Sequence, residues 1–407
     1  MIEQICNASD CTACGACKTV CPVHCISMHI NEYGIVFPVI DHNKCLECKL
    51  CINTCPNNNA VYAHNPIKCY VGWSFDNETR QTSASGGIAS EIYKYCASNH
   101  ITSVGCELIG SSDCHLKVIR PGDEIKKFRN SKYVYSSTDD TYKELVSLIR
   151  KGEKVIFIGL PCQVAGLKNC LSRDYDNLTT VDIICHGVAP QEYLKQHIEN
   201  RIKGRKNLNN LDIKFRDPEL TGGTASYWFT ISKVGESVEY AKKVYDNDEY
   251  QYGYHKALIY RDNCYRCRYA KGKRVGDLTI SDFSGLGKII PWNKEKTNVS
   301  CILVNTDKGA KLLDSLKDRI YIEERPLDEA LKYEHQLSQP SIPHPKRDVF
   351  IANYSKTHNF DRSVRGAVGN ILMKNHLKET MRITDIRNYI AGVIPTDLKR
   401  VIRRKIL

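Results

Sequence analysis

Eight cysteines near the start of the chain have the residue type and the spacing to hold iron–sulfur clusters. They form two copies of the pattern C-x2-C-x2-C-x3-C-P and are Cys11, Cys14, Cys17, Cys21, Cys45, Cys48, Cys51 and Cys55. In this pattern three closely spaced thiolates bind one cluster and the fourth binds the cluster of the other copy. The sequence therefore predicts two [4Fe–4S] clusters with crossed ligation. One set is Cys11, Cys14, Cys17 and Cys55, and the other is Cys45, Cys48, Cys51 and Cys21.

The doubled pattern resembles that of bacterial two-cluster ferredoxins, and other uses of eight cysteines fit it less well. Structural zinc sites use two close pairs of ligands, whereas each copy here has three cysteines at a constant interval. A disulfide framework is typical of small secreted chains, and no apolar signal segment precedes these cysteines. Cys6 and Cys25 lie outside the pattern, and we interpret them as small buried side chains.

The chain has 407 residues, far more than this cysteine module needs, and a formal net charge of +12. We expect residues 1–64 to form the cluster module, 65–340 a larger domain and 341–407 a basic helical appendage. No apolar run approaches the roughly 20 residues that cross a bilayer. This feature and the cysteine module favour a reducing cytoplasm. No aromatic-interleaved basic patch accompanies the charge, which argues against nucleic acid as a partner.

The residues after the cluster module alternate between strand and helix patterns. Residues 154–159 and 181–185 are apolar runs typical of buried strands, and each is followed by a helical stretch. Apolar residues at helical spacing also follow the Ser85-Gly86-Gly87 segment. Further strands are favoured at residues 211–215, 227–232, 277–280 and 301–305, and further helices at 307–316 and 327–333. These patterns predict an α/β domain, in which ligands bind beyond the carboxyl ends of the strands.

Four more cysteines stand in the loops expected around this sheet, and they are Cys162, Cys185, Cys264 and Cys267. The first two follow predicted strands, and the last two form a C-x2-C in a basic stretch. Four cysteines suffice for one more [4Fe–4S] cluster. A C-x2-C with two distant cysteines would serve zinc equally well, and either of the first two alone could be an inert buried thiol. The spacing leaves these alternatives open.

Short motifs around these cysteines occur in a fixed order along the chain. They are residues 83–87 (SASGG), 131–134 (SKYV), 159–163 (GLPCQ), 182–187 (DIICHG), 264–267 (CYRC) and 276–283 (GDLTISDF). This succession resembles the beta subunit of coenzyme F420 (deazaflavin) hydrogenases and dehydrogenases over about residues 1–310. It is also similar to the related 7-hydroxymethyl chlorophyll a reductase. One departure is Ser284, where relatives usually carry tryptophan, so the packing of that loop is expected to differ.

The resemblance implies an FAD-containing iron–sulfur oxidoreductase, in which Cys162, Cys185, Cys264 and Cys267 hold a third [4Fe–4S] cluster beside the flavin. It implies FAD contacts from Ser83, Ser85, Gly86, Gly87, Ser131, Lys132, Tyr133 and His186. The fold class we expect is α+β and α/β: a two-cluster ferredoxin module, a larger mixed α/β flavin-binding domain and a helical C-terminal appendage.

The chemistry of these residues is consistent with FAD binding but allows simpler roles. Glycines before a helix let backbone N–H groups approach a phosphate, whereas a serine N-cap with flexible glycines would look the same. Lys132 and Tyr133 could offer charge and an aromatic edge, or be an ordinary surface pair. His186 could donate to the flavin or the cluster, or be a loop histidine that the backbone satisfies.

The expected function is therefore an exchange of electrons between a two-electron substrate or carrier at FAD and one-electron clusters. The expected partner is a redox protein or a low-potential electron carrier, and no catalytic residue is assigned. The substrate could be a deazaflavin, a sugar nucleotide or another carrier. The alternative is a non-catalytic electron-transfer subunit that docks to a separate redox enzyme, as in surface-polysaccharide biosynthesis.

The end of the chain, residues 399–407, alternates basic and apolar side chains. This pattern suits a helix in weak contact with a membrane surface or, alternatively, a solvated terminal helix.

Overall fold

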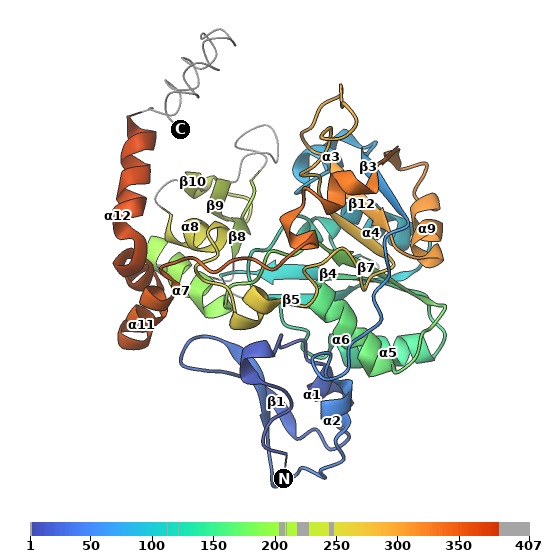
Figure 1. The fold of residues 1–407 in the computed structure, drawn as a ribbon, viewed down its shortest axis with the longest axis horizontal. Helices are drawn as coiled ribbons and strands as arrows, with labels where there is room; N and C mark the ends of the chain where they lie inside the picture. The colour runs from blue at the N-terminus through green and yellow to red at the C-terminus, as the bar shows by residue number, and fades with distance from the viewer. Residues whose placement is uncertain are drawn as a thin grey trace.

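The computed structural model describes residues 2–111, 113–120, 122–202, 208, 210–217, 228–243 and 248–381. Figure 1 shows the N-terminal cluster module at one end of the molecule, beneath a large sheet with helices and a smaller lobe that carries the C-terminal helices. Within those ranges no helix has both the length and the apolar character needed to cross a membrane. The basic end at residues 399–407 lies outside the described residues.

The cluster module consists of two equivalent halves around a hairpin. The first half carries η1 (Ala8–Asp10) and α1 (Ala16–Val20), the second carries α2 (Leu50–Thr54), and β1 (Ile26–Ile30) pairs antiparallel with β2 (Val36–Ile40) between them. Cys21 and Cys55 each follow the end of a helix at the same position in the repeat. The repeated cysteine spacing therefore folds into a repeated structure.

The large domain is built on an eight-stranded mixed sheet. Its strands, in spatial order, are β13 (Ile320–Arg325), β3 (Lys68–Ser74), β12 (Ser300–Val304), β11 (Leu278–Asp282), β7 (Leu178–Ile183), β6 (Val155–Gly159), β4 (Thr102–Ile109) and β5 (Asp113–Ile119). The four strands β11, β7, β6 and β4 run parallel in the centre, and the outer strands pair antiparallel. The strands predicted at residues 154–159 and 181–185 are β6 and β7, two of the parallel strands.

Helices cover both faces of this sheet. The helices α4 (Ile88–Ser98) and α9 (Asp307–Asp314) share a core with one face, and α5 (Thr141–Arg150) and α6 (Pro161–Leu171) share a core with the other. Strand β6 supplies alternate residues to the two cores, Ile156 and Ile158 to the first and Val155 and Phe157 to the second. Because both faces are covered, β6 is buried along its whole length. The short helices α3 (Asn77–Thr82), α10 (Leu327–Leu331), η2 (Ile125–Phe128) and η4 (His335–Leu337) lie at the edges.

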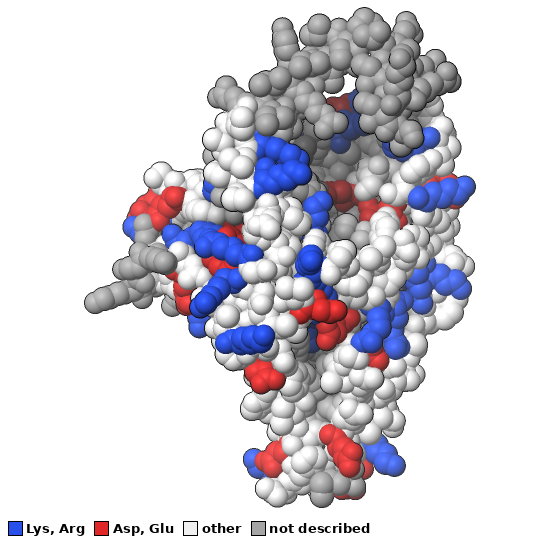
Figure 2. Space-filling view, turned by 60° about the vertical axis from the view of Figure 1, so that its left-hand side comes forward, with Lys and Arg blue, Asp and Glu red and all other residues white. Residues whose placement is uncertain are grey.

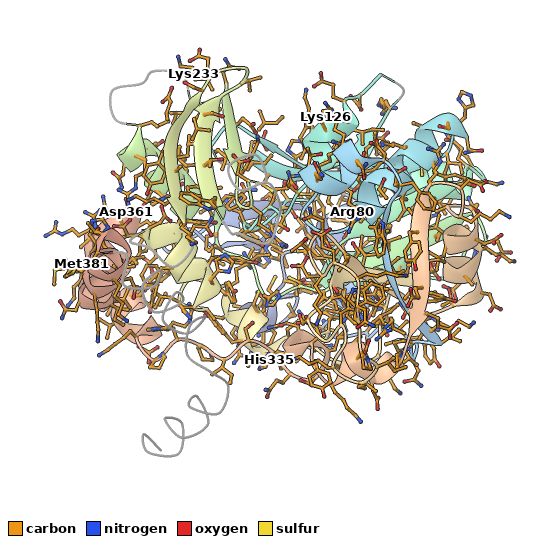
Figure 3. All side chains as sticks on the ribbon, turned by 90° about the horizontal axis from the view of Figure 1, so that it is seen from above. Arg80, Lys126, Lys233, His335, Asp361 and Met381 are labelled. Carbon is orange, nitrogen blue, oxygen red and sulfur yellow. The ribbon has the colours of Figure 1, made fainter. Side chains whose placement is uncertain are left out.

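The smaller lobe combines a three-stranded sheet with helices. It contains α7 (Gln191–Arg201), β8 (Leu211–Lys214), β9 (Trp228–Lys233), β10 (Val238–Lys243), α8 (Glu249–His255), η3 (Asp262–Arg266), α11 (Arg347–Thr357) and α12 (Phe360–Thr380). Its core includes the fully buried rings of Phe229, Tyr250, Phe350 and Phe360. Figure 3 shows Lys233 of β9 and Asp361 of α12 on the side of the molecule opposite Arg80 and Lys126. The C-terminal helices thus share a core with α7 and α8.

A buried ionic cluster ties this lobe together. His197 of α7 bonds Asp248 through Nε2 at 3.0 Å and Asp361 of α12 through Nδ1 at 2.7 Å. Tyr240 donates to Asp248 at 2.7 Å, and Arg201 pairs with Glu249. Because both ring nitrogens already bond carboxylates, we interpret this cluster as a charged histidine between two aspartates rather than as a metal site.

The fold class predicted from the sequence is confirmed: a two-cluster ferredoxin-type module, a larger mixed α/β domain and C-terminal helices.

Candidate cluster and cofactor sites

Each predicted set of module cysteines lines its own small cavity. One cavity, of about 310 Å³, is lined by Cys11, Cys14, Cys17 and Cys55. The other, of about 320 Å³, is lined by Cys21, Cys45, Cys48 and Cys51. The fourth cysteine of each repeat thus lies with the three cysteines of the other repeat, which is the arrangement that crossed ligation requires.

The two cysteine loops have the same backbone conformation. The residues on either side of the second cysteine have positive φ in both copies, +52° and +78° at Ala13 and Gly15, +54° and +61° at Glu47 and Lys49. In both loops an amide N–H donates to the sulfur two residues earlier, Ala13 to Cys11 and Glu47 to Cys45, each at 3.4 Å. Three of the four residues are not glycine, so this backbone conformation is strained and persists only where the surrounding structure requires it. Wrapping of each loop around a cluster is such a demand.

The structure brings the second cysteine constellation together. The cysteines Cys162, Cys185, Cys264 and Cys267 come from three segments and line one cavity of about 870 Å³. Cys162 lies in the first turn of α6, not in a loop as expected, because Pro161 begins the helix directly after β6. Cys185 follows β7, and the last two lie in and after η3. Buried Arg274 crosses the base of this cavity and bonds Asp182 of β7 at 2.9 Å.

The four sulfurs are spread more widely than the ligands of a tetrahedral zinc ion. Tetrahedral zinc with Zn–S bonds of about 2.3 Å needs sulfurs about 3.8 Å apart. Among the residues that the structure describes, no three of these cysteines bring their Sγ atoms within 4.8 Å of one another. Burial raises the pKa of all four thiols. Burial therefore opposes the thiolate form at each of the four positions.

The cluster module is fixed against this cavity by direct contacts. Cys14 lines both its own module cavity and the 870 Å³ cavity. Its Sγ would lie 3.0 Å from a Cβ placed on Gly166 of α6, the helix that begins with Pro161 and Cys162. Thr138 donates to the carbonyl of Cys14 at 3.1 Å, and buried Arg261 donates to the carbonyl of Cys11 at 3.1 Å. One module site therefore lies against the third site.

A much larger cavity, of about 1760 Å³, lies on the other side of the third site. It shares wall residues with the 870 Å³ cavity, namely Ser136, Leu160, Gln163, Cys185, His186, Gly187 and Val188. Gly187 has a φ of +146°, and a Cβ there would lie 2.4 Å from the Tyr260 ring, so only glycine fits at this wall. The two cavities are therefore separated by little more than the chain around Cys185.

The amino end of α4 opens into the large cavity. The helix is preceded by Gly87 at a φ of +85°, which provides no side-chain cap, and the first-turn residues Ile88, Ala89 and Ser90 line the cavity. Arg129, also at the wall, donates to Thr82 just before the 83–87 segment at 2.9 Å. The Nε of Arg129 is buried, with no hydrogen-bond partner in the described structure. Unbonded helix N–H groups beside an arginine form a site suited to a phosphate-bearing cofactor.

The residues of the 83–87 segment divide between the cavity and the sheet. Ser83, Ser85 and Gly87 line the cavity. The hydroxyl of Ser85, however, donates a hydrogen bond to the carbonyl of Val299 at 2.6 Å. Gly86 faces the sheet, where a Cβ would lie 2.3 Å from the carbonyl oxygen of Gly72. Gly86 is thus required for packing, and we do not include it among the residues proposed to contact a cofactor.

The other predicted contacts also lie at the wall. Ser131, Lys132, Tyr133 and His186 all line the large cavity. Lys132 donates to the carbonyl of Arg129 at 2.6 Å, and Tyr133 stacks on Tyr254 at a centroid distance of 4.4 Å. His186 is exposed to the cavity. Sequence reasoning missed Arg129 and Tyr254, because only the folded chain brings them to this wall.

Ser284, the departure from the family pattern, also lines the large cavity. It donates to Glu334 at 2.6 Å, so a polar pair occupies the place at which a large ring was expected.

Two small cysteine-lined cavities, a third beside them and a large cavity next to that define an iron–sulfur electron-transfer protein. The comparisons with known proteins agree. Residues 152–330 match the family model for the C terminus of the beta subunit of coenzyme F420 hydrogenase/dehydrogenase, and residues 10–59 match the 4Fe-4S dicluster domain. Residues 152–330 are therefore similar to this family of beta subunits, and residues 10–59 are similar to the dicluster ferredoxin domain.

Individual relatives are distant. One component of the F(420)H(2) dehydrogenase of Methanosarcina mazei is 19% identical over 342 residues, which cover 80% of this chain and 87% of the relative. The coenzyme F420-dependent sulfite reductase of Methanocaldococcus jannaschii is 24% identical over 41% of this chain and 26% of its own. A ferredoxin-like protein of Sinorhizobium fredii is 42% identical over 55 residues, 12% of this chain and 78% of its own.

Among solved structures, a chain of the F420-reducing [NiFe] hydrogenase complex from Methanosarcina barkeri aligns with a TM-score of 0.42 and 16% identity. The alignment covers 74% of this chain and 91% of that one.

Proposed function

We propose that this chain is a flavin-dependent iron–sulfur oxidoreductase that passes electrons between a two-electron carrier and a row of three [4Fe–4S] clusters. The observation that carries the proposal is the sequence of shared walls. Cys14 lines both a module cavity and the third-site cavity, and Cys185 lines both the third-site cavity and the large cavity. Redox groups held in these cavities would be close neighbours, as successive electron transfer requires.

The large cavity suits FAD by its size and its polar groups. It holds about twice the empty space of the third-site cavity, 1760 against 870 Å³. The amino end of α4 and Arg129 would hold the phosphates, and the stacked Tyr133 and Tyr254 offer an aromatic wall. Asn130 Oδ1, buried at the same wall with no hydrogen-bond partner in the described structure, is an acceptor that a ligand would satisfy. FAD would supply the conversion between two-electron and one-electron chemistry.

The far end of the cluster module would exchange electrons with a redox protein or a low-potential carrier. The loop over the second module cavity is exposed at Cys48, and Leu46 and Leu50 beside it are 66% and 45% exposed. Figure 2 shows acidic and basic side chains at the tip of this narrow end and mostly uncharged residues between the tip and the body. Exposed leucines over a cluster, here interleaved with the exposed Glu47 and Lys49, are suited to transient docking.

Relatives named for coenzyme F420 make a deazaflavin the first carrier to test, with sugar nucleotides and nicotinamides as the other classes. We place the activity in a reducing cytoplasm, because the thiolate ligands must stay free of disulfides.

The test is purification of the full chain without oxygen, followed by quantification of iron, sulfide and flavin. The chain is then mixed separately with reduced deazaflavin, NADH, NADPH and reduced ferredoxin, and the flavin and cluster absorbances are followed. We expect stoichiometric FAD, and reduction first of the flavin and then of the clusters by one hydride donor. A chain that binds no flavin but exchanges electrons with reduced ferredoxin would refute the proposal and establish the alternative, a non-catalytic electron-transfer subunit.

A further inference from the structure

Two cysteines outside all three cluster sets face each other beside the large cavity. Cys106 lies on β4 and Cys114 on its neighbour β5, and their Sγ atoms are 3.4 Å apart. The strand register places Cys106 opposite Leu116 and Cys114 opposite Leu108, so the two cysteines are diagonal neighbours on the same face. Cys106 lines the large cavity, whereas Cys114 is fully buried behind it.

The surroundings prepare Cys106 to react. A hydrogen bond from the Cys114 thiol lowers the pKa of Cys106 to about 7, and the charge of Lys132 adds to this against the opposing effect of burial. The thiolate is the reactive form of cysteine, and the Cys114 thiol and Lys132 both favour that form at Cys106. The Sγ separation exceeds a disulfide bond of about 2.05 Å by only about 1.4 Å. Because diagonal neighbours on a sheet are far apart at the backbone, closing the bond would combine side-chain rotation with a local adjustment of the two strands.

A second cysteine pair provides an internal comparison. Cys69 of β3 and Cys301 of β12 have Sγ atoms 3.9 Å apart and are also diagonal neighbours on adjacent antiparallel strands. Both are buried in a core beside the sheet, and neither lines the large cavity. The hydrogen bond to Cys69 and burial hold the pKa of Cys301 well above its usual value. This pair therefore has the proximity without the cavity.

We propose that Cys106 and Cys114 form a reversible dithiol–disulfide pair that stores two electrons at the wall of the large cavity. On oxidation the S–S bond forms as both S–H bonds break. Two electrons and one proton leave as hydride to an oxidised hydride carrier in the cavity, and the second proton passes to water. On reduction the same class of carrier returns the hydride, and water returns the proton. The pair would hold both electrons of one hydride while the clusters remove them singly.

This inference rests on the proposed function only in that the cavity binds a hydride carrier, so the chemistry of the pair is tested first. The full chain with its cofactors is equilibrated without oxygen in buffers of reduced and oxidised dithiothreitol, quenched in acid, alkylated and analysed by peptide mass spectrometry. We expect alkylation of Cys106 and Cys114 to be lost together in one two-electron step, while Cys69 and Cys301 stay alkylated throughout. Full alkylation of Cys106 at every ratio, or equal oxidation of both pairs, would overturn the proposal.

Electron counting tests the pair in the working protein. Fully oxidised wild-type chain should take up two more electrons in an anaerobic dithionite titration than Cys106→Ser, at equal iron and flavin content. The matched control Cys69→Ser should take up the same number as the wild type. Suppose that the wild type takes up two more electrons than Cys106→Ser, but no hydride donor reduces the clusters of the wild type. This result would support the dithiol–disulfide pair and refute the proposed function. If hydride donors do reduce the wild type, but the wild type and Cys106→Ser take up the same number of electrons, the dithiol–disulfide pair would be refuted and the proposed function would stand.

Discussion

Replacement of Cys185 by serine is the most direct test of the third cluster site. Cys185 is the proposed ligand that lines both the 870 and the 1760 Å³ cavity, and it comes from a segment that carries none of the other three cysteines. Serine is nearly isosteric, so the fold should tolerate it, but its hydroxyl is a far weaker ligand for iron than a thiolate. The change should therefore remove the third cluster and leave the eight module cysteines untouched.

The size of the effect follows from the three cysteine-lined cavities. Four irons per cubane give about twelve irons and twelve sulfides in the wild type, and about eight of each in Cys185→Ser. Cys170→Ser is the matched control, because Cys170 is buried on α6, the helix that also carries Cys162, but does not line the cavity and donates to the carbonyl of Ala16 at 3.7 Å. This control should keep about twelve irons.

The assay combines metal analysis with a rapid-mixing experiment. Dithionite should reduce the module clusters of Cys185→Ser, whereas a hydride donor that reduces the flavin should no longer reach them. A wild type with about eight irons and one tightly bound zinc would refute the third cluster. A Cys185→Ser chain that still passes electrons from hydride donor to module at the wild-type rate would refute the proposed order of sites, even if the iron count fell as expected.

Three further predictions test other parts of the structure. Cys55→Ser should alter the spectrum of the cluster assigned to Cys11, Cys14 and Cys17 and not that of its own repeat, since it lines their cavity; a change confined to its own repeat would contradict crossed ligation. Arg129→Gln should lower the affinity for FAD about tenfold to a hundredfold, because a charged hydrogen bond worth about 1.5–3 kcal/mol is lost. Flavin retention measures this effect, and the control Arg80→Gln, which lies off the cavity wall, should retain FAD as the wild type does. Burial opposes the charge on His197, but the two bonded aspartates outweigh it and raise its pKa to about 9 from 6.5. The charged His197 should therefore add about 3 kcal/mol to the free energy of unfolding below pH 6.5, and this contribution should be lost as the pH rises through 9. A His197→Gln chain whose stability to urea falls by the same amount over that pH range would contradict this.

The parts of the site that could be predicted from the sequence are those encoded by local spacing. The two cysteine repeats need only one short loop each, so their interval alone indicates both the cluster type and the crossed ligands. The buried runs that become β6 and β7 are short, apolar and bounded by turn residues, and they therefore indicate which cysteines stand at strand ends. The helical position of Cys162 also had a local signal, because Pro161 is favoured at the first position of a helix.

The remaining features depend on contacts between distant segments, which no local pattern reports. Arg129 reaches the 83–87 segment through Thr82, 47 residues earlier in the chain. Gly86 looked like a phosphate-binding glycine, but its neighbour is the backbone of Gly72 on β3. The Cys106–Cys114 pair exists because β4 and β5 pair in one register, and a shift of one residue would turn the cysteines to opposite faces.

The contacts between the cluster module and the large domain imply that the first and third sites keep a fixed separation. Thr138 and Arg261 bond backbone carbonyls of the first cysteine loop, not its flexible side chains. A Cβ on Gly15 of that loop would lie 2.1 Å from the Thr138 hydroxyl, so the two surfaces meet without room for a side chain. Asn169 of α6 adds bonds to the carbonyls of Thr54 and Asn59 at 3.1 and 2.7 Å on the second half of the module. Since these contacts hold both halves of the module, the module is not a tethered carrier that swings between partners. In the proposed function, a carrier that takes the electrons would instead come to the exposed loop at Cys48.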